Sequence, residues 1–461
     1  MAGTLKNFIP ARLRRPIGRV LIRTGMVKKP LSGPDLQTKI LSAVTLRGQG
    51  DARAGEALLR RALNGDLRGH AGLPRDYIRE LLAAVEQRRS LALPEDGTPD
   101  LLLEHTASLD GALLPCKRWL VLHGACICNG LFKVAGAARD KAIEAAYVEA
   151  SAPTASADSL VQAFKAAIDQ GEFEGAAGFL ARLRSVDSRR SLIDDLQMYY
   201  YLNRGDIQEF RALAKDRLTE GDSAFADYIK GESMAIVGPA PSGEDSGVEI
   251  DSFDIVARFS YRGRQFLPNP EQFGTKVDVS YYAMVVASQI EALEDHAFFA
   301  DLRFALFKSL EYSFQKRLLQ SQIGRVLSRN NSFFDGSPMG LQNALFDLLH
   351  FRPGRVKLFH VNFFLAQSYY HPGYIIGRAE QAVSGDRPRK ILDRWLGLAH
   401  HGLVNQLNFT RNLWKAGLIE ADNSCEAVLR LTPAEYMAAI EEVYVINPIK
   451  EYAEQRPRPP G

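Results

Sequence analysis

Cysteine is scarce in this chain of 461 residues, and the few cysteines form no metal-binding pattern. The four are Cys116, Cys126, Cys128 and Cys425, with no CxxC pair and no histidine at the spacing of a zinc site. Isolated cysteines of this kind are typical of thiols that stay reduced in a hydrophobic core. The pattern argues against a disulfide-rich secreted domain and favours a reducing, cytoplasmic compartment.

Long apolar runs are also missing. The most apolar stretch, residues 119–132, has only 14 residues and contains His123 and Asn129. It is too short to span a bilayer and predicts a buried helix. No uninterrupted apolar segment follows the basic residues near Met1, which argues against a secretory signal. At this length the chain is expected to form two or three domains.

Charge is nearly balanced over the whole chain but not along it. The net charge of +3 is too small to indicate a nucleic-acid partner, yet residues 1–30 hold eight basic side chains before the first acid, Asp35. Segment 1–34 predicts either an amphipathic helix on an anionic membrane surface or a flexible basic head. Pro10 and Pro16 weaken the helical alternative. The expected location is therefore cytoplasmic, with peripheral attachment to the membrane left open.

Residues 35–230 are rich in alanine and leucine at helical spacing and nearly lack strand-like runs. Gly171 and Gly205 occupy the same place in two similar segments, residues 169–177 and 203–211, and their separation of 34 residues equals the period of tetratricopeptide repeats. We predict an all-α helical domain, either a repeat-like array of helical hairpins or a generic helical bundle. Its expected role is to hold a protein partner, build a dimer or position the second half of the chain.

Beyond residue 230 the pattern changes to that of an α/β domain, predicted for residues 231–450, and residues 451–461 are expected to be a disordered tail. Residues 234–238 form a short apolar run that ends in glycine, as a buried parallel strand does. The loop 239–247 is rich in small residues, and such a loop lets backbone N–H groups approach a phosphate. Its glycines fit neither GxGxxG nor a Walker loop, so spacing alone gives a weak nucleotide signal.

The segment from Val237 to Ser260 resembles the large sialyl motif of family 29 glycosyltransferases, the sialyltransferase-type family. The motif reads roughly V-G-N-S, a variable loop, and then G-x-x-I-D-x-x-D-x-V-x-R-x-N. The matching residues are Val237, Gly238, Gly247, Ile250, Asp251, Asp254, Val256 and Arg258. Residues 273–278, Phe-Gly-Thr-Lys-Val-Asp, are similar to the G-x-K-T segment of the same family.

Three further segments occur in the order of the family's other motifs. Ser337-Pro338-Met339-Gly340 resembles the small sialyl motif, P-[ST]-[ST]-G followed by an apolar helix. Tyr369-Tyr370-His371 stands at the place of the third motif. His401-Gly402 leads into an amphipathic helix and is similar to the very small motif. The resemblance covers the chain from about residue 233 to residue 446.

The resemblance implies a sialyltransferase-type variant of the nucleotide-binding GT-A-like fold. It implies an inverting, metal-independent transfer of a sialic acid-like sugar from a CMP-sugar to a glycan, with no other cofactor. His401 is expected to act as the base on the acceptor hydroxyl, and His371 to donate to the leaving phosphate. Asp251 and Asp254 are expected to brace the loop rather than react. The implied substrate-binding residues are Gly238, Pro239, Ala240, Arg258, Ser260, Ser337, Met339, Gly340 and Tyr370.

Both histidines have a structural alternative. His400 adjoins His401, and only the register to the following helix favours the second of the two. His371 could instead cap a helix or pack within an aromatic loop.

Several positions depart from the family pattern. Pro239 replaces an asparagine and has no N–H to donate, Ser260 replaces a second asparagine, Met339 replaces a hydroxyl residue, and His360 stands where the family has glycine. Two alternatives therefore remain open: a degenerate transferase domain that binds nucleotide or glycan without turnover, and a transferase for another nucleotide sugar. The expected setting is a bacterial enzyme that modifies lipid-linked or envelope polysaccharide at the cytoplasmic membrane face.

Overall fold

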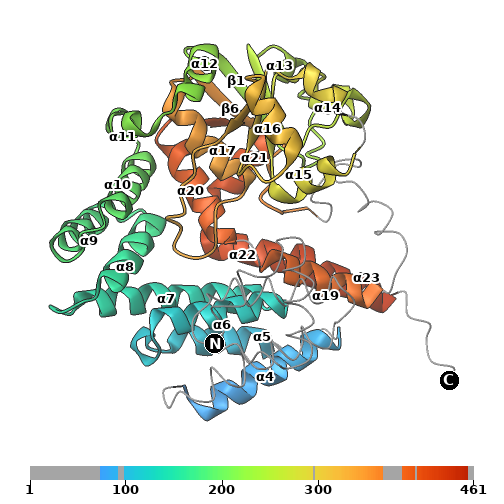
Figure 1. The fold of residues 1–461 in the computed structure, drawn as a ribbon. Coiled ribbons are helices and arrows are strands. Elements are labelled where there is room, and N and C mark those ends of the chain that lie inside the picture. The colour runs from blue at the N-terminus through green and yellow to red at the C-terminus, as the bar shows by residue number, and fades with distance from the viewer. Residues whose placement is uncertain (1–72, 92–97, 294–295, 367–386, 400–401, 455–461) are drawn as a thin grey trace, which may run out of the picture.

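The computed structural model describes residues 73–91, 98–293, 296–366, 387–399 and 402–454. An α/β unit built on one parallel sheet lies against a layer of helices (Figure 1). The predicted basic head, residues 1–34, lies outside the described residues. None of the described helices is long and apolar enough to cross a bilayer.

The described chain before the sheet is helical. Its helices are α4, Arg75–Arg89; α5, Thr98–Ser108; α6, Cys116–Cys128; α7, Phe132–Ser151; α8, Ala157–Gln170; α9, Phe173–Val186; α10, Arg190–Arg204; α11, Ile207–Ala214; and α12, Glu220–Ile229, with 3₁₀ turns at Gly111–Leu113 and Lys215–Arg217. Gly171 (φ 75°) ends α8 and Gly205 (φ 90°) ends α10 in the left-handed conformation. Since α9 packs on α8 and α11 on α10, the glycine echo marks two successive helical hairpins.

The apolar stretch at residues 119–132 forms a buried helix, as predicted, but the helix ends early. Gly130 (φ 72°) turns the chain between α6 and α7, and α7 begins at Phe132. The four cysteines are buried and take part in no disulfide, which confirms the prediction of core thiols.

Seven parallel strands form the sheet, in the order β5-β4-β3-β2-β1-β6-β7. The strands are β1, Ser233–Val237; β2, Ile255–Phe259; β3, Val279–Tyr282; β4, Phe304–Phe307; β5, Gly324–Val326; β6, Arg355–Phe359; and β7, Glu420–Ala421. Most of their residues are buried, as expected for parallel strands with helices on both faces. The chain runs from β1 outward to β5 and then returns to add β6 on the other side, so the strand order reverses between β1 and β6. This architecture confirms the α/β class.

Further helices connect and follow the strands. They are α13, Gly247–Asp251; α14, Pro270–Phe273; α15, Met284–Glu291; α16, Ser313–Gln320; α17, Gly340–Leu348; α19, Arg387–Leu398; α20, Leu403–Lys415; α21, Asn423–Arg430; α22, Pro433–Glu441; and α23, Asn447–Glu454, with 3₁₀ turns at Arg264–Phe266, Ala297–Asp301 and Leu349–Phe351 and a π-helical turn at Glu442–Ile446. α23 reaches Glu454, past the predicted start of a disordered tail at residue 451, because Ile449 is buried and Tyr452 packs against the core.

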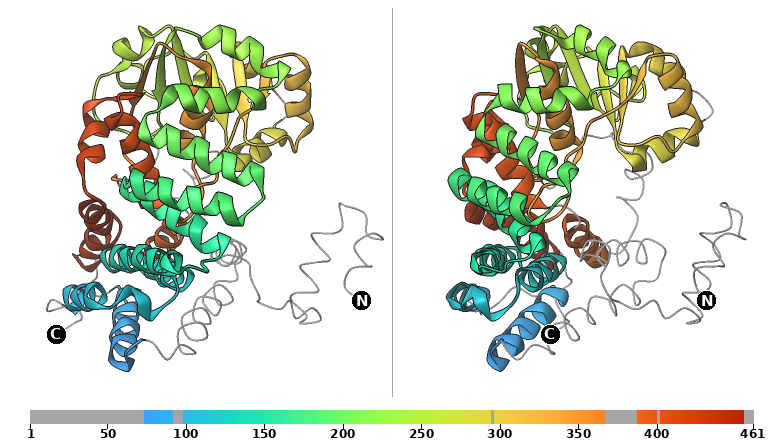
Figure 2. Two further views of the ribbon diagram at one scale, coloured as in Figure 1. Left: turned by 90° about the vertical axis from the view of Figure 1, so that its left-hand side faces the viewer. Right: turned by 60° about the vertical axis from the view of Figure 1, so that its left-hand side comes forward.

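The last helices pack back on the first ones. α22 contacts α7 and α19 contacts α6, and Figure 2 shows these late helices, in red and brown, beside the teal ones. Arg88 Nη2 of α4 donates to Glu441 Oε1 of α22 at 2.6 Å, with both side chains buried. One hydrophobic core runs from Leu73 to Ile449. The helical and α/β segments therefore share a core across the boundary that the sequence suggests at residue 230.

Candidate functional site

Two loops leave the carboxyl ends of the neighbouring strands β1 and β6, where the strand order reverses. Gly238 N donates to Phe359 O at 2.7 Å, and Ala240 N donates to His360 O at 3.2 Å. A Cβ on Gly238 would lie 2.4 Å from the carbonyl oxygen of His360, so the two loops approach as closely as glycine allows. In open α/β sheets, ligands bind outside the carboxyl ends of the strands at such a reversal.

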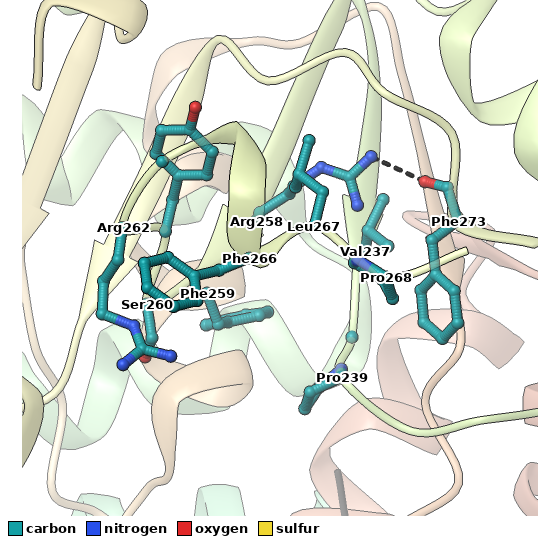
Figure 3. Close-up of a pocket in the computed structure, with 13 residues that line it drawn as sticks. Val237, Pro239, Arg258, Phe259, Ser260, Arg262, Phe266, Leu267, Pro268 and Phe273 are labelled. Atoms are coloured by element: carbon teal, nitrogen blue, oxygen red, sulfur yellow. Dashed lines mark hydrogen bonds between the residues drawn. The ribbon is translucent and has the colours of Figure 1, made fainter. Parts of the chain in front are cut away.

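Two adjoining cavities lie at this point and share Gly238, Pro239 and Phe259. The larger has a volume of about 140 Å³, and the smaller, drawn in Figure 3, about 30 Å³. The larger cavity is further lined by Ala240, Met339, Gly340, Leu341, Gln342, His360, Val361, Asn362, Phe363, Phe364 and Gln406. The smaller is further lined by Val237, Arg258, Ser260, Tyr261, Arg262, Gly263, Phe266, Leu267, Pro268 and Phe273.

Most of the substrate-binding residues predicted from the motifs meet at these cavities. They are Gly238, Pro239, Ala240, Arg258, Ser260, Met339 and Gly340. Ser337 is not among the lining residues, and its carbonyl oxygen accepts a hydrogen bond from Gln406 Nε2 at 2.9 Å. Tyr370, His371 and His401 lie outside the described residues.

Arg258 fixes the wall of the smaller cavity. Its Nη2 donates to Phe273 O at 2.6 Å (Figure 3), and its Nε donates to Lys276 O at 2.9 Å. Burial lowers the pKa of Arg258 to about 10, and the nearby Asp251 carboxylate opposes this shift. The guanidinium is therefore still charged at neutral pH, where it holds the 273–276 loop and adds positive charge to the cavity.

Asp251 and Asp254 brace the backbone, as predicted. Asp251 Oδ1 accepts from Lys276 N at 2.9 Å, and its Oδ2 accepts from Thr275 N at 2.9 Å. Burial would raise the pKa of Asp251, but these backbone hydrogen bonds bring it below its ordinary value. Asp254 Oδ2 accepts from Ser233 N at 2.9 Å, which ties β1 to the start of β2.

The small motif is held by a residue that the sequence did not identify as part of the site. Met339 is the N-cap of α17 and offers no side-chain cap. Gln406 of α20 takes this role, because its Oε1 accepts from Met339 N at 3.1 Å while its Nε2 holds Ser337 O. Gly340, the first residue of α17, lines the larger cavity. The partial positive charge of this helix start favours an anion there.

The role of His360 was not predicted from the sequence, although this residue stands where the family has glycine. The ring is fully buried, with Nδ1 2.7 Å from Ser242 Oγ and Nε2 2.7 Å from Gln272 O. Burial lowers its pKa, so the neutral ring donates from Nε2 to the Gln272 carbonyl and accepts from the Ser242 hydroxyl at Nδ1. His360 N donates to Asp422 Oδ2 at 2.7 Å. These contacts join the loop after β6 to the loop after β1.

The loop after β6 is held in an unusual backbone conformation. His360 (φ 56°), Phe363 (φ 47°) and Phe364 (φ 70°) all have positive φ values, which side chains other than glycine rarely adopt. Tyr436 Oη donates to Phe363 O at 2.7 Å and Tyr444 Oη donates to Phe364 O at 2.6 Å. Such strain persists only where surrounding contacts impose it, and it concentrates at functional sites.

The helical layer reaches the site through a buried ion cluster. Arg139 of α7 donates from Nε to Asp335 Oδ2 at 3.2 Å and from Nη2 to Asn405 Oδ1 at 3.2 Å. Asn405 of α20 donates in turn to the Asp335 carbonyl oxygen. Asp335 lies two residues before the small motif, so α7 and α20 together fix one wall of the larger cavity.

The charge of the cavities favours an anionic ligand. Among the described residues that line them, Arg258 and Arg262 are cations and none is an aspartate or glutamate. Within the described parts of the chain, no group of three or more His, Cys, Asp or Glu residues is placed to hold a metal ion.

Comparison with known proteins gives no relative for this chain. No protein-family model, no curated protein and no solved structure matches it. The motif resemblance and the geometry of the cavities are therefore the grounds on which a function can be proposed.

Proposed function

We propose that this chain is an inverting, metal-independent glycosyltransferase of the sialyltransferase type. Its donor would be a CMP-activated, sialic acid-like sugar and its acceptor a glycan. The observation that carries the proposal is the meeting of Gly238, Pro239, Arg258 and Met339, from two separate motifs, at one pair of cavities beside the strand-order reversal. That is the place where α/β sheets of this type bind nucleotides.

The two cavities offer what a nucleotide requires. The larger cavity presents the aromatic side chains of Phe259, Phe363 and Phe364, against which a base can pack. The start of α17 and the two arginines of the smaller cavity supply positive charge for a phosphate. Pro239 has no N–H, so the contact that the family makes from this position must come from another group.

In this proposal His401 accepts the proton of the acceptor hydroxyl while the hydroxyl oxygen attacks the anomeric carbon of the donor sugar. The bond from that carbon to the phosphate oxygen breaks on the opposite face, so the configuration inverts. His371 donates to the phosphate oxygen as negative charge develops on the leaving CMP. Both roles are carried over from the motifs.

The catalytic roles predict a clear difference between two adjacent histidines. His401→Asn should slow transfer by about 10²–10⁴-fold, because the acceptor hydroxyl loses its base, while CMP binding remains. His400→Asn is the matched control and should keep most of the activity. The measurement is CMP release from CMP-N-acetylneuraminate or CMP-Kdo in the presence of glycan acceptors.

The same assay separates the alternatives. Wild-type protein that binds CMP but releases none from any CMP-sugar would favour a non-catalytic binding module. Turnover of UDP- or GDP-sugars instead would favour a transferase with another donor. Loss of activity in His400→Asn alone would move the base to His400.

The setting of the enzyme is also part of the proposal. Residues 1–30 would contact an anionic membrane surface at the cytoplasmic face, and the helical layer would hold a protein partner. An acceptor on lipid-linked or envelope polysaccharide fits this placement.

A further inference from the structure

Two tyrosines near the end of the described chain hold the loop that follows β6. Tyr436 of α22 and Tyr444 of the π-helical turn are both fully buried. Tyr436 Oη donates to Phe363 O at 2.7 Å. Tyr444 Oη shares its proton between Phe364 O at 2.6 Å and Ala366 O at 2.7 Å. Because Phe363 and Phe364 line the larger cavity, the two hydroxyls hold the backbone that carries this part of its wall.

We propose that Tyr436 and Tyr444 are positioning residues of the donor site, which act on the nucleotide through the loop at residues 360–366. This inference rests on the proposed function and names what keeps the wall for the base in its shape. Neither tyrosine is among the described residues that line the two cavities, so each acts through the loop that it holds.

The loop needs such support because its backbone conformation is unfavourable. Phe363 (φ 47°) and Phe364 (φ 70°) both lie in the left-handed region, where a side chain crowds the backbone. Within the loop, Leu365 N donates to Asn362 O at 2.8 Å and Phe364 N donates to Asn362 Oδ1 at 3.1 Å. These two bonds shape the turn but do not anchor it to another element. The tyrosine hydroxyls provide an anchor, and a conformation of this kind persists only where surrounding contacts impose it.

The π-helical turn explains how tyrosines eight residues apart reach the same loop. Eight residues of α-helix rotate by about 800°, which would leave the second side chain about 80° past two full turns. The hydrogen bonds of a π-helix span five residues instead of four. The turn at Glu442–Ile446 therefore winds more slowly and brings Tyr444 back toward the face of Tyr436. Such turns are frequent at functional sites.

The helical layer fixes the two tyrosines in turn. α22 contacts both α7 and α20, and Figure 1 shows it between the helical layer and the α/β unit. Glu441, which lies between the tyrosines in the sequence, accepts from Arg88 Nη2 at 2.6 Å and from Lys133 N at 2.9 Å. Trp395 Nε1 of α19 donates to Tyr444 O at 2.6 Å. These contacts connect α4, α7 and α19 to the wall of the larger cavity.

The test compares Tyr436→Phe and Tyr444→Phe with the wild type and with Tyr77→Phe. Each substitution removes one hydroxyl and keeps the ring, so the packing is preserved. Tyr77 of α4 is the matched control, because it is also fully buried and its Oη lies 3.1 Å from Thr106 Oγ1 of α5. The dissociation constant for CMP is measured by calorimetry, and thermal unfolding without ligand shows whether each variant is folded.

We expect Tyr436→Phe and Tyr444→Phe each to weaken CMP binding by about three- to tenfold, because carbonyl groups that lose their donor release the loop. Tyr77→Phe should lower thermal stability by a similar amount and leave the affinity for CMP unchanged. If both loop variants bind CMP with the affinity of the wild type and lose only stability, the tyrosines serve the fold alone and the inference is overturned.

Amide hydrogen exchange distinguishes failure of this inference from failure of the proposed function. Without ligand, Tyr436→Phe and Tyr444→Phe should exchange the amides of residues 361–366 faster than the wild type, while exchange in the strands stays the same. Wild type that binds no CMP, together with this faster exchange, contradicts the proposed function and supports the anchoring of the loop. Unchanged exchange in the loop of both variants would overturn the anchoring itself.

Discussion

Replacing Asp335 with alanine is expected to lower the free energy of unfolding by about 3–5 kcal/mol. Asp335 Oδ2 lies 3.2 Å from Arg139 Nε and 3.2 Å from His123 Nε2, and the Arg139 side chain is 2% exposed. Without Asp335, both groups stay buried, and Asp169 remains the charge partner of Arg139 at 2.8 Å. Denaturant unfolding followed by circular dichroism measures the loss.

The matched control is Asp76→Ala on α4. Asp76 pairs with Arg79 at 2.8 Å, but both side chains are largely exposed, so the cost should stay below about 1 kcal/mol. Similar losses in the two variants would contradict the role given to the buried cluster.

The pH dependence gives an independent check on Asp335. Burial would raise its pKa, but the charge of Arg139 and the hydrogen bond from His123 hold the pKa far below its ordinary range. Because the folded pKa lies below the unfolded value of about 3.9, the stabilisation is present above that pH and is lost as the pH falls below it. The stability gap between wild type and Asp335→Asn should therefore shrink below about pH 4. A gap that widens on acidification would count against this account.

Gly238→Ala is expected to abolish CMP binding and to cost about 1–3 kcal/mol of stability. The added methyl group would lie 2.4 Å from His360 O and 2.9 Å from Val361 Cγ2. The loops after β1 and β6 must therefore separate, and both line the larger cavity. Calorimetric titration with CMP below the unfolding temperature measures binding in protein that is still folded.

Gly178→Ala is the control for this substitution. Gly178 lies within α9, and a Cβ there would meet no atom within 4 Å. Since glycine in a helix costs roughly 0.5–1 kcal/mol relative to alanine, this variant should gain stability and bind CMP normally. If Gly238→Ala binds CMP with the affinity of the wild type, the loops after β1 and β6 do not form the CMP site.

Short-range features of the fold could be predicted from the sequence. The run at residues 234–238 became β1, and the helix expected after Gly340 became α17. Gly171 and Gly205 marked two helix ends because a left-handed C-cap strongly favours glycine. In each case the pattern and its cause lie within a few residues of one another.

Long-range contacts could not be predicted in this way. Arg139 lies in a helical segment, where the sequence gives no sign that its side chain is buried. Its partner Asp335 is 196 residues further along the chain. Likewise the packing of α22 on α7 depends on which apolar faces meet, and periodicity identifies a face without its partner. The shared core of the two segments was therefore missed.

The motifs predicted several residues that line the two cavities, but they did not predict the residues that support the cavity walls. Gly238, Pro239 and Met339, which come from two separate motifs, line the same cavity. Gln406 and His360 were missed because each acts through one side chain on distant backbone groups, a relation that leaves no spacing signal. Residues that support a site in this way can be identified only from the three-dimensional structure.

The most direct test of the central claim is calorimetric titration of the wild-type protein with CMP, UDP and GDP at one ionic strength. The account predicts saturable binding of CMP with a stoichiometry of one and much weaker binding of UDP and GDP. Tight CMP binding must also raise thermal stability, by about 2.7 kcal/mol at a hundredfold excess over Kd. Absence of CMP binding at millimolar concentration, or a preference for UDP or GDP, would contradict the claim that this cavity is a CMP-sugar site.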